Sequence, residues 1–242
     1  MLIATWNLNN RVGNHRFHSD TANAAISLDV DILVFTEYYP QEYGAAFCRA
    51  LNDEGWPHQE ESRNTGEKAN RILIASRFPI QPLNVCLPDF DLQFPSNVLC
   101  VSVPSINISI VGVRIPSYKG EDAGLIFKAW EWLESASTSL IDRPSIILGD
   151  LNVDLNKKKL YRSKGEDYFR RILELGWHRA IPKGAASYYG NRGDRSEIDP
   201  ILGTNLCKFN DARYIKELNS FLFAGGKDEI SDHAALLVEV AV

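Results

Sequence analysis

The sequence lacks the features that mark membrane, secreted and repeat proteins. No segment of its 242 residues approaches the roughly 20 continuous apolar residues of a membrane span. The N-terminal stretch has no basic region followed by an apolar one, so we expect no signal peptide and a cytoplasmic location. Internal repeats, low-complexity tracts and Pro/Ser-rich linkers are absent too. We therefore expect one domain over residues 1–242 and no obligate protein partner.

Paired cysteines and an excess of basic charge are also missing. The four cysteines form no C-x-x-C pair and lie near no His at zinc-ligand spacing, so we expect buried free thiols at Cys48, Cys86, Cys100 and Cys207. The formal net charge is -5, whereas proteins that grip long nucleic acids usually carry a basic excess. This balance argues against extended duplex binding. It does not exclude a nuclease, because an acidic metal site itself contributes negative charge.

Short runs of β-branched and aliphatic residues alternate with amphipathic stretches. The runs predict buried strands at Leu2–Thr5, Ile32–Thr36, Arg71–Ala75, Val98–Val103, Ile108–Val113, Ser145–Leu148, Ile198–Leu202 and Ala234–Val240. The amphipathic stretches predict helices at Ser19–Leu28, Gln41–Asn52, Asp122–Leu140 and Asp167–Leu175. We expect Ser19 or Asp20, and Asp122, to act as caps. Residues 104–107 predict a hairpin. Hairpins mixed with helical crossovers favour an α+β (α/β) fold with two mixed β-sheets packed face to face and helices outside.

Polar residues stand at the ends of these predicted strands. They are Asn7, Glu37, Arg114, Asp150, Asn152, Asp199, Asp232 and His233. Each alone has a structural explanation as a turn, cap or solvated residue. Together they form a set of carboxylates and amides that suits Mg²⁺ or Mn²⁺, and one His without thiolates argues against zinc. Hydrolysis of a phosphate ester needs a positioned water, a base and charge stabilisation, and this set supplies all three.

The order of these residues resembles that of the endonuclease/exonuclease/phosphatase superfamily, which includes deoxyribonuclease I, exonuclease III-type nucleases, inositol polyphosphate 5-phosphatases and sphingomyelinases. The matching motifs are Thr5-Trp6-Asn7-Leu8-Asn9, Thr36-Glu37, Gly149-Asp150-Leu151-Asn152, Ile198-Asp199 and Ser231-Asp232-His233. They span residues 5–240, essentially the whole chain. The resemblance implies a four-layer sandwich of two packed β-sheets flanked by helices.

The resemblance also implies a role for each matching residue. Glu37 is the expected principal metal ligand, assisted by Asn7, and Asn9 stands where relatives carry a metal-site Asp or Asn. Asp232 is expected to contribute to the metal site directly or through water. Asp150 is expected to hold or activate the attacking water, and Asn152 to bind the scissile phosphate. His233 is expected to contact the phosphate or transfer a proton, with Asp199 orienting its ring. The general base, Asp150 or His233, stays open, as does the number of metals.

Two departures from the superfamily pattern bear on the substrate. Arg114 occupies a place where relatives often have His or Tyr, and its guanidinium suits phosphate oxygens but cannot transfer a proton. Residues 196–198 replace the Trp-Arg pair of abasic-site enzymes, which argues against that activity, and Glu197 near a DNA phosphate is unfavourable.

Several loop residues are candidates for substrate contacts. A cationic rim with one aromatic face, suited to a nucleotide or short single strand, is expected from Arg11, Arg71, Tyr118 and Lys119. The stretch around Ser187 resembles a family segment, so Ser187 is expected to help bind phosphate. Arg16 is expected to be solvated.

The sequence therefore predicts a Mg²⁺- or Mn²⁺-dependent phosphodiesterase acting on nucleic acid or a nucleotide-like substrate. A phosphomonoesterase for a small phosphorylated metabolite or inositol phosphate is the alternative. Sphingomyelinase activity ranks third, because the loops are polar. A catalytically inactive binding module is disfavoured, because the expected ligands and catalytic groups are present. The preference for DNA or RNA and the endo- or exonucleolytic mode stay open.

Overall fold

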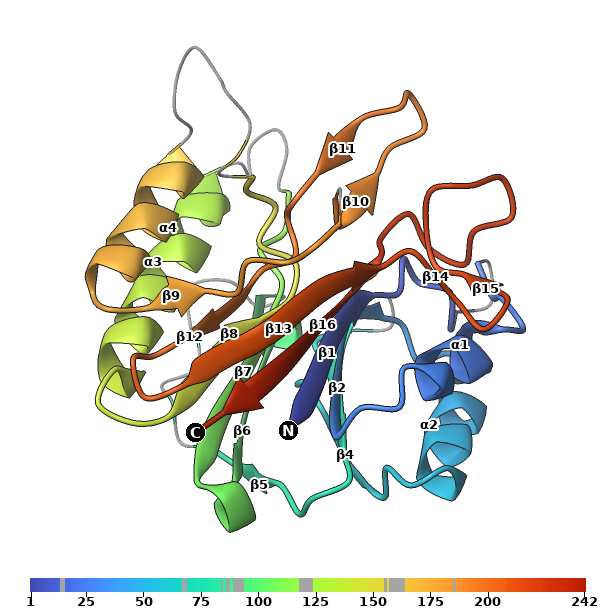
Figure 1. The fold of residues 1–242 in the computed structure, drawn as a ribbon, viewed down its shortest axis with the longest axis horizontal. Helices are drawn as coiled ribbons and strands as arrows, with labels where there is room; N and C mark the ends of the chain where they lie inside the picture. The colour runs from blue at the N-terminus through green and yellow to red at the C-terminus, as the bar shows by residue number, and fades with distance from the viewer. Residues whose placement is uncertain are drawn as a thin grey trace.

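A computed structural model describes the chain except residues 14–15, 67–68, 84, 86–87, 89–93, 118–123, 155, 157–163 and 185. Two six-stranded β-sheets lie face to face, with helices on their outer sides (Figure 1). The first sheet has the order β13 (Lys208–Ile215), β16 (Ala235–Ala241), β1 (Leu2–Asn7), β2 (Ile32–Tyr38), β4 (Arg71–Ser76) and β3 (His58–Glu61). The second has the order β5 (Gln81–Pro82), β6 (Val98–Val103), β7 (Ile108–Val113), β8 (Ser145–Leu148), β12 (Ile201–Gly203) and β9 (His178–Arg179).

Each sheet contains one parallel pair among antiparallel neighbours. β1 pairs in parallel with β2, and β7 pairs in parallel with β8. Parallel strands need a crossover, which helix α1 (Thr21–Ser27) supplies in the first sheet and α3 (Leu125–Leu140) in the second. Helices α2 (Gly44–Asp53) and α4 (Lys164–Glu174) pack beside them, α2 by α1 and α4 by α3. The carboxyl ends of the two parallel pairs therefore face the same edge of the molecule.

Alternation along the strands builds the four layers. In β2, Ile32 and Val34 belong to the core between the two sheets, whereas Leu33 and Phe35 belong to the core under α1 and α2. Trp130 of α3 belongs to a third core on the outer face of the second sheet. Successive strand residues point to opposite faces, so strands that are apolar throughout become buried on both sides. The predicted four-layer sandwich of two packed mixed sheets is confirmed.

Most predicted elements match the structure, with shifts at their ends. The hairpin between β6 and β7 closes through the short 3₁₀ helix Pro104–Ile106, and Asn107 takes a positive φ of 50°. Asp20, one of the two expected caps, stands at the N-cap of α1, but its side chain makes no cap hydrogen bond. The cap expected at Asp122 lies outside the described residues. Cys48, Cys100 and Cys207 are free thiols, two of them buried.

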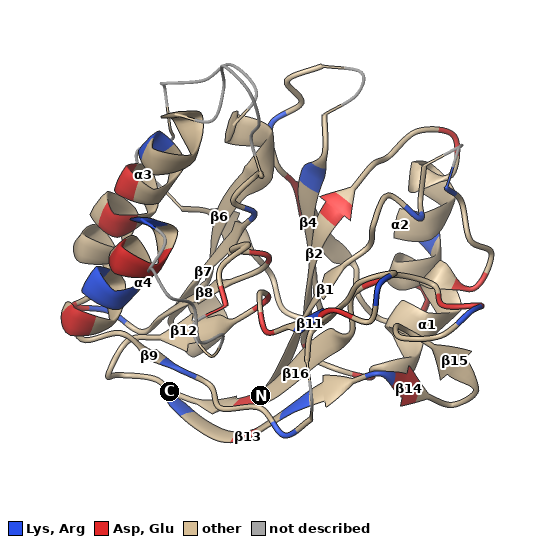
Figure 2. Cartoon of the chain, turned by 90° about the horizontal axis from the view of Figure 1, so that it is seen from above, with Lys and Arg blue, Asp and Glu red and all other residues tan. Residues whose placement is uncertain are grey.

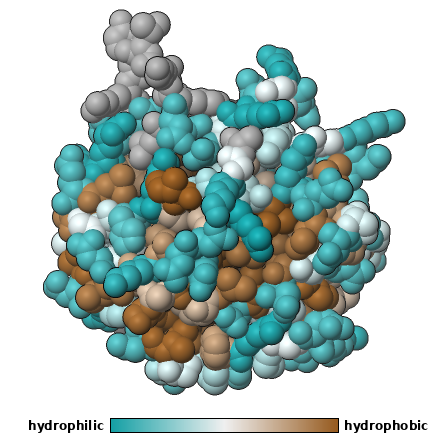
Figure 3. Space-filling view, in the orientation of Figure 1, coloured by the Kyte–Doolittle hydropathy of each residue, from teal (hydrophilic) through white to brown (hydrophobic). Residues whose placement is uncertain are grey.

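Two small hairpins extend beyond the sheets. They are β10 (Tyr188–Tyr189) with β11 (Arg195–Ser196), and β14 (Glu217–Leu218) with β15 (Phe221–Leu222). The first projects from the edge where the parallel pairs end (Figure 1). The face over β13 and β16 carries hydrophobic side chains between hydrophilic ones (Figure 3). In the part of the chain that the structure describes, no helix is long and apolar enough to cross a membrane.

Candidate active site

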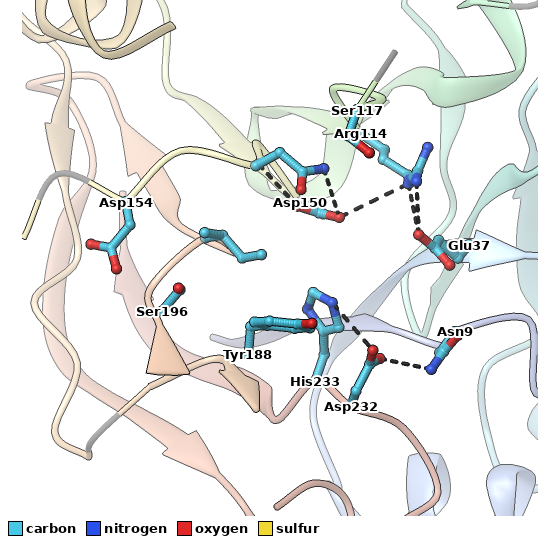
Figure 4. A pocket seen from close by; sticks show the side chains of 12 residues that line it. Asn9, Glu37, Arg114, Ser117, Asp150, Asp154, Tyr188, Ser196, Asp232 and His233 are labelled. Atoms are coloured by element: carbon cyan, nitrogen blue, oxygen red, sulfur yellow. Dashed lines mark hydrogen bonds and ion pairs between the residues drawn. The ribbon is translucent and has the colours of Figure 1, made fainter. Parts of the chain in front are cut away.

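A pocket of about 430 Å³ opens at the edge where β1, β2, β7 and β8 end. Polar groups from both sheets line it (Figure 4). The described lining residues are Asn9, Glu37, Arg114, Ser117, Asp150, Asn152, Asp154, Tyr188, Ser196, Ile198, Asp232 and His233. Six segments that are far apart in sequence therefore meet at one place, held by the ends of rigid strands.

Asp150 joins the two sheets at the floor of the pocket. Its side chain follows β8 in the second sheet, and its Oδ2 accepts a hydrogen bond of 3.1 Å from Nδ2 of Asn7, the last residue of β1 in the first sheet. The backbone N–H and side-chain Nδ2 of Asn152 donate to the same carboxylate at 3.0 and 3.2 Å. Only 2% of Asp150 is exposed, so these donors fix the direction of its carboxylate. Asn7 and Asn152 thus hold Asp150 in a single orientation.

The turn before Asp150 depends on glycine. Gly149 has a φ of +131°, and a Cβ there would lie 2.1 Å from the carbonyl oxygen of Val113 in β7. The backbone thereby brings Asp150 against the end of the neighbouring strand, where N–H of Ile115 donates to its carbonyl oxygen. Glycine is required here both for the φ value and for the close approach.

We predict that Gly149→Ala destabilises the protein by about 2–4 kcal/mol, because it adds backbone strain and a steric clash. Gly193 is a matched control, since its φ is +81° and nothing lies within 4 Å of its Cβ position. Gly193→Ala is expected to cost about 1 kcal/mol, from the φ value alone. Urea unfolding of both variants measures the difference. Equal losses would mean that the contact with Val113 has no role.

Glu37 reaches the pocket through an irregularity in β2. The pairing of β2 with β4 shifts register between Phe35 and Tyr38, and Glu37 takes a φ of +50°. Such a bulge re-aims a side chain that would otherwise follow the alternation of the strand. Oε1 of Glu37 accepts a hydrogen bond of 2.9 Å from Nε of Arg114 and forms an ion pair of 2.9 Å with its Nη2. Oε2 accepts one of 3.2 Å from Nδ2 of Asn10.

His233 and Asp199 form a buried pair beside the pocket. Nδ1 of His233 lies 2.7 Å from Oδ2 of Asp199, and the two residues are only 6% and 1% exposed. Trp6 fixes the backbone at His233 by donating its indole N–H to the carbonyl oxygen at 2.8 Å. The ring of Tyr188 packs on the imidazole with centroids 5.1 Å apart. With Nδ1 engaged by Asp199, Nε2 is the ring atom left to face the pocket.

Asp232, Asn9 and Arg16 form a chain of contacts at the pocket edge. Nδ2 of Asn9 donates to Oδ1 of Asp232 at 2.8 Å, and Arg16 donates to Oδ1 of Asn9. Oδ1 of Asp232 also lies 3.9 Å from Nε2 of His233. These contacts connect the segment after β1 with the segment before β16, and Asp232 lies between His233 and Asn9.

Burial and neighbouring charges shift the pKa of two catalytic groups. Burial raises the pKa of Asp150 to about 7, with a further increase from Asp199, while His233 and Arg114 oppose the rise. For His233, burial lowers the pKa, but the charge and hydrogen bond of Asp199 outweigh it and raise the pKa to about 10. The charge and hydrogen bond of Asp199 therefore favour the protonated imidazole.

Comparison with known proteins gives the fold and the family. Over residues 4–233 the chain matches the model of the Endonuclease/Exonuclease/phosphatase family. The chain belongs to this family. It is therefore a hydrolase of phosphate esters, of the nuclease or phosphatase type. No curated protein sequence matches it.

Solved structures of family enzymes share this fold. The 3′ phosphatase NExo from Neisseria, bound to a product DNA hairpin, aligns with a TM-score of 0.79 at 22% identity over 100% of both chains. The 3′-5′ exonuclease NExo from Neisseria meningitidis aligns with a TM-score of 0.75 at 23% identity over 99% of both. An AP endonuclease from Archaeoglobus fulgidus aligns with a TM-score of 0.75 at 18% identity over 100% of both.

The donor set of this family member fits a hard divalent cation. Four carboxylates border the pocket beside Arg114 and His233, so carboxylate oxygens predominate among its charged groups. The carboxylates are Glu37, Asp150, Asp154 and Asp232. Within the described ranges no group of three or more His, Cys, Asp or Glu side chains is arranged to hold a metal. Mg²⁺ commonly binds through one or two carboxylates and keeps several waters, and Glu37 and Asp232 suit that arrangement.

Some residues expected at the substrate lie elsewhere. Arg71 pairs with Glu61 at 2.6 Å, and neither Arg71 nor Arg11 borders the pocket. Ser187 is fully buried. Its hydroxyl accepts from N–H of Ile198 and Asp199, so it shapes the loop that carries Asp199 and does not reach a phosphate. Tyr118 and Lys119 lie outside the described residues.

Other predicted residues act differently from the first expectation. Asn7 is 1% exposed and does not border the pocket, and it contacts Asp150. Both N–H groups of the Asn152 amide are used inside the protein, by Asp150 and by the carbonyl oxygen of Ile115. A contact between Asn152 and a phosphate therefore needs one of these hydrogen bonds to be exchanged.

The sequence did not mark several residues of the pocket. They are Ser117, Asp154, Tyr188 and Ser196, whereas Ile198 belongs to the Ile198-Asp199 motif that the sequence indicated. Asp154 accepts hydrogen bonds from N–H of Asn156 and Glu197, which fixes the loop before Asp199. Arg16 is exposed, as expected, and its side chain donates to Asn9. Of these residues, only Tyr188 was indicated by the sequence, because it follows Ser187 in a segment that resembles one of the family.

Proposed function

We propose that this protein is a Mg²⁺- or Mn²⁺-dependent phosphodiesterase that acts on nucleic acid or a nucleotide-like substrate. One observation carries the proposal: the oriented carboxylate of Asp150, the Asp199–His233 pair and the carboxylate of Glu37 border one pocket. A base, a charged donor and a site for a hard cation are the three parts that attack of water on a phosphate ester requires. A cytoplasmic location and a single catalytic domain over residues 1–242 are part of this proposal.

Each residue has a role that follows from its contacts. Glu37 and Asp232, with Asn9 beside them, would hold the cation, which would polarise the phosphoryl group and balance its negative charge. Asp150 accepts a hydrogen bond from the attacking water and directs it towards phosphorus, because Asn7 and Asn152 fix its orientation. Water attacks in line with the leaving oxygen.

His233 acts on the opposite side of the reaction. Asp199 holds its ring through Nδ1, so Nε2–H is directed at a phosphoryl oxygen or the leaving oxygen. Arg114 donates to phosphate oxygens, for which its planar fork is suited. This division leaves charge stabilisation to His233 and Arg114 and the handling of water to Asp150.

The named activities of similar structures support a nucleic-acid substrate, since they include a 3′ phosphatase with a DNA hairpin and a 3′-5′ exonuclease. Lys and Arg are scattered along the described part of the chain and form no single stripe there (Figure 2). This favours a short or unpaired segment over a long duplex. The same 3′ phosphatase makes phosphate monoester hydrolysis the second candidate.

A substrate panel tests the proposal. It compares bis-p-nitrophenyl phosphate, p-nitrophenyl phosphate, single- and double-stranded DNA, RNA and inositol phosphates, each with Mn²⁺ or EDTA. We expect metal-dependent cleavage of the diester and of single-stranded nucleic acid. Release of phosphate from monoesters alone would move the function to the second candidate, and a pure, folded and metal-loaded protein inactive on every substrate would contradict both.

A further inference from the structure

We propose that Arg114 competes with the divalent cation for Glu37, and that a substrate phosphate relieves this competition, so that metal and phosphate bind cooperatively. The inference rests on the proposed metal site. It concerns Arg114, which stands where the superfamily pattern often has His or Tyr.

The geometry shows that Glu37 is already engaged by a cation. Nε and Nη2 of Arg114 both lie 2.9 Å from Oε1 of Glu37, and Nε lies 3.9 Å from Oδ2 of Asp150. The Arg114 and Glu37 side chains are only 16% and 15% exposed, so solvent screens this pair less than a surface pair. The other oxygen of Glu37 accepts from Asn10. A metal ion that uses Glu37 must therefore share it with a guanidinium or displace it.

The position of Arg114 gives it a second partner. It follows β7 at the pocket edge, where its backbone N–H is fixed by the carbonyl oxygen of Asn97. The side chain lines the same pocket as Asp150 and His233, where the phosphate is expected. A phosphate offers a guanidinium two oxygens in a bidentate arrangement, as Glu37 does not here. When Arg114 turns to the phosphate, the negative charge of Glu37 becomes available to the metal.

Linkage makes this effect reciprocal. If a bound phosphate increases the affinity for metal, bound metal increases the affinity for phosphate by the same factor. A protein with an uncharged residue at position 114 would bind metal well in the absence of phosphate, and phosphate would no longer increase its metal affinity. Metal affinity and coupling therefore report on Arg114 without any turnover.

Isothermal titration of the full chain with Mn²⁺ alone tests the competition. We expect Arg114→Gln to bind Mn²⁺ about tenfold more tightly than the unchanged protein, as expected for loss of a partly buried competing cation. Arg71→Gln is the matched control, because it also removes one positive charge but its partner is Glu61. It is expected to leave the Mn²⁺ affinity nearly unchanged. An equal gain in both variants would reduce the effect to general charge and overturn the proposal.

The same titration in the presence of dimethyl phosphate tests the coupling. We expect this diester to increase the Mn²⁺ affinity of the unchanged protein several-fold and to have no such effect on Arg114→Gln. If Glu37→Gln weakens Mn²⁺ binding but Arg114→Gln leaves it unchanged or weakens it too, the competition is overturned and the metal site of the proposed function stands. Mn²⁺ binding that Glu37→Gln leaves intact would overturn the proposal together with the metal site of the proposed function.

Discussion

The Asp150→Asn variant is expected to lose about 10³-fold in kcat for phosphodiester hydrolysis, within the range for a proton-transfer group. The amide matches the carboxylate in size but carries no charge and accepts no proton from water. Its NH₂ group would also face Nδ2 of Asn7 or of Asn152, which now donate to Asp150. Single-turnover kinetics with bis-p-nitrophenyl phosphate at saturating Mn²⁺ measures the loss.

Asp31→Asn is the matched control for this change. Oδ2 of Asp31 accepts a hydrogen bond of 2.8 Å from N–H of Leu2. Asp31 precedes β2 in the first sheet, at the end of that strand away from the pocket. The control is expected to leave kcat unchanged, and both variants should keep the thermal unfolding transition of a folded protein. A folded Asp150→Asn protein with a near-normal rate would remove Asp150 from the chemistry.

The His233→Ala variant is expected to lose a similar factor, about 10³ in kcat, because His233 is the only histidine among the described lining residues and the other donors there cannot transfer a proton in the same way. KM for a small diester should change much less, since the effect falls on the transition state. His178→Ala is a suitable control, because that histidine lies in β9 at the edge of the second sheet and packs on Phe209 with centroids 5.0 Å apart. A large rise in KM at normal kcat would instead make His233 a binding residue.

Asp199 is expected to act through His233. Asp199→Asn should lower kcat by about 10²-fold, because the amide holds the ring less well and does not stabilise its charge. Adding Asp199→Asn to His233→Ala should cost little more, since residues of one unit are not additive. Losses that multiply in the double variant would show that Asp199 has a separate role.

The sequence predicts the strands of this fold better than its peripheral elements. β6, β7 and β8 were predicted to the residue because they are apolar on both faces and bounded by turns. β13 was missed, because its burial alternates with exposed charged residues such as Lys208 and Arg213. The four short strands of the two small hairpins, β10, β11, β14 and β15, have two residues each and were missed too. Such short strands are defined by their pairing with other strands, which the local sequence pattern does not encode.

For the site, the sequence indicated residues and not their contacts. Glu37, Asp150, Asp232 and His233 lie together because strand ends converge, as expected from their positions. Nothing local shows that Ser187 turns inward. The bulge that carries Glu37 forms where β2 pairs with β4, and the pair of Glu37 with Arg114 joins the first sheet to the second, so both depend on residues far apart in sequence.

The most direct test of the central claim is the rate of bis-p-nitrophenyl phosphate hydrolysis as a function of free Mn²⁺, for the unchanged protein and Glu37→Gln. The account predicts that EDTA abolishes the activity, that Mn²⁺ restores it, and that Glu37→Gln needs at least about tenfold more Mn²⁺ for half activation, as loss of one charged ligand implies. Full activity in EDTA, or identical Mn²⁺ dependence of the two proteins, would contradict it.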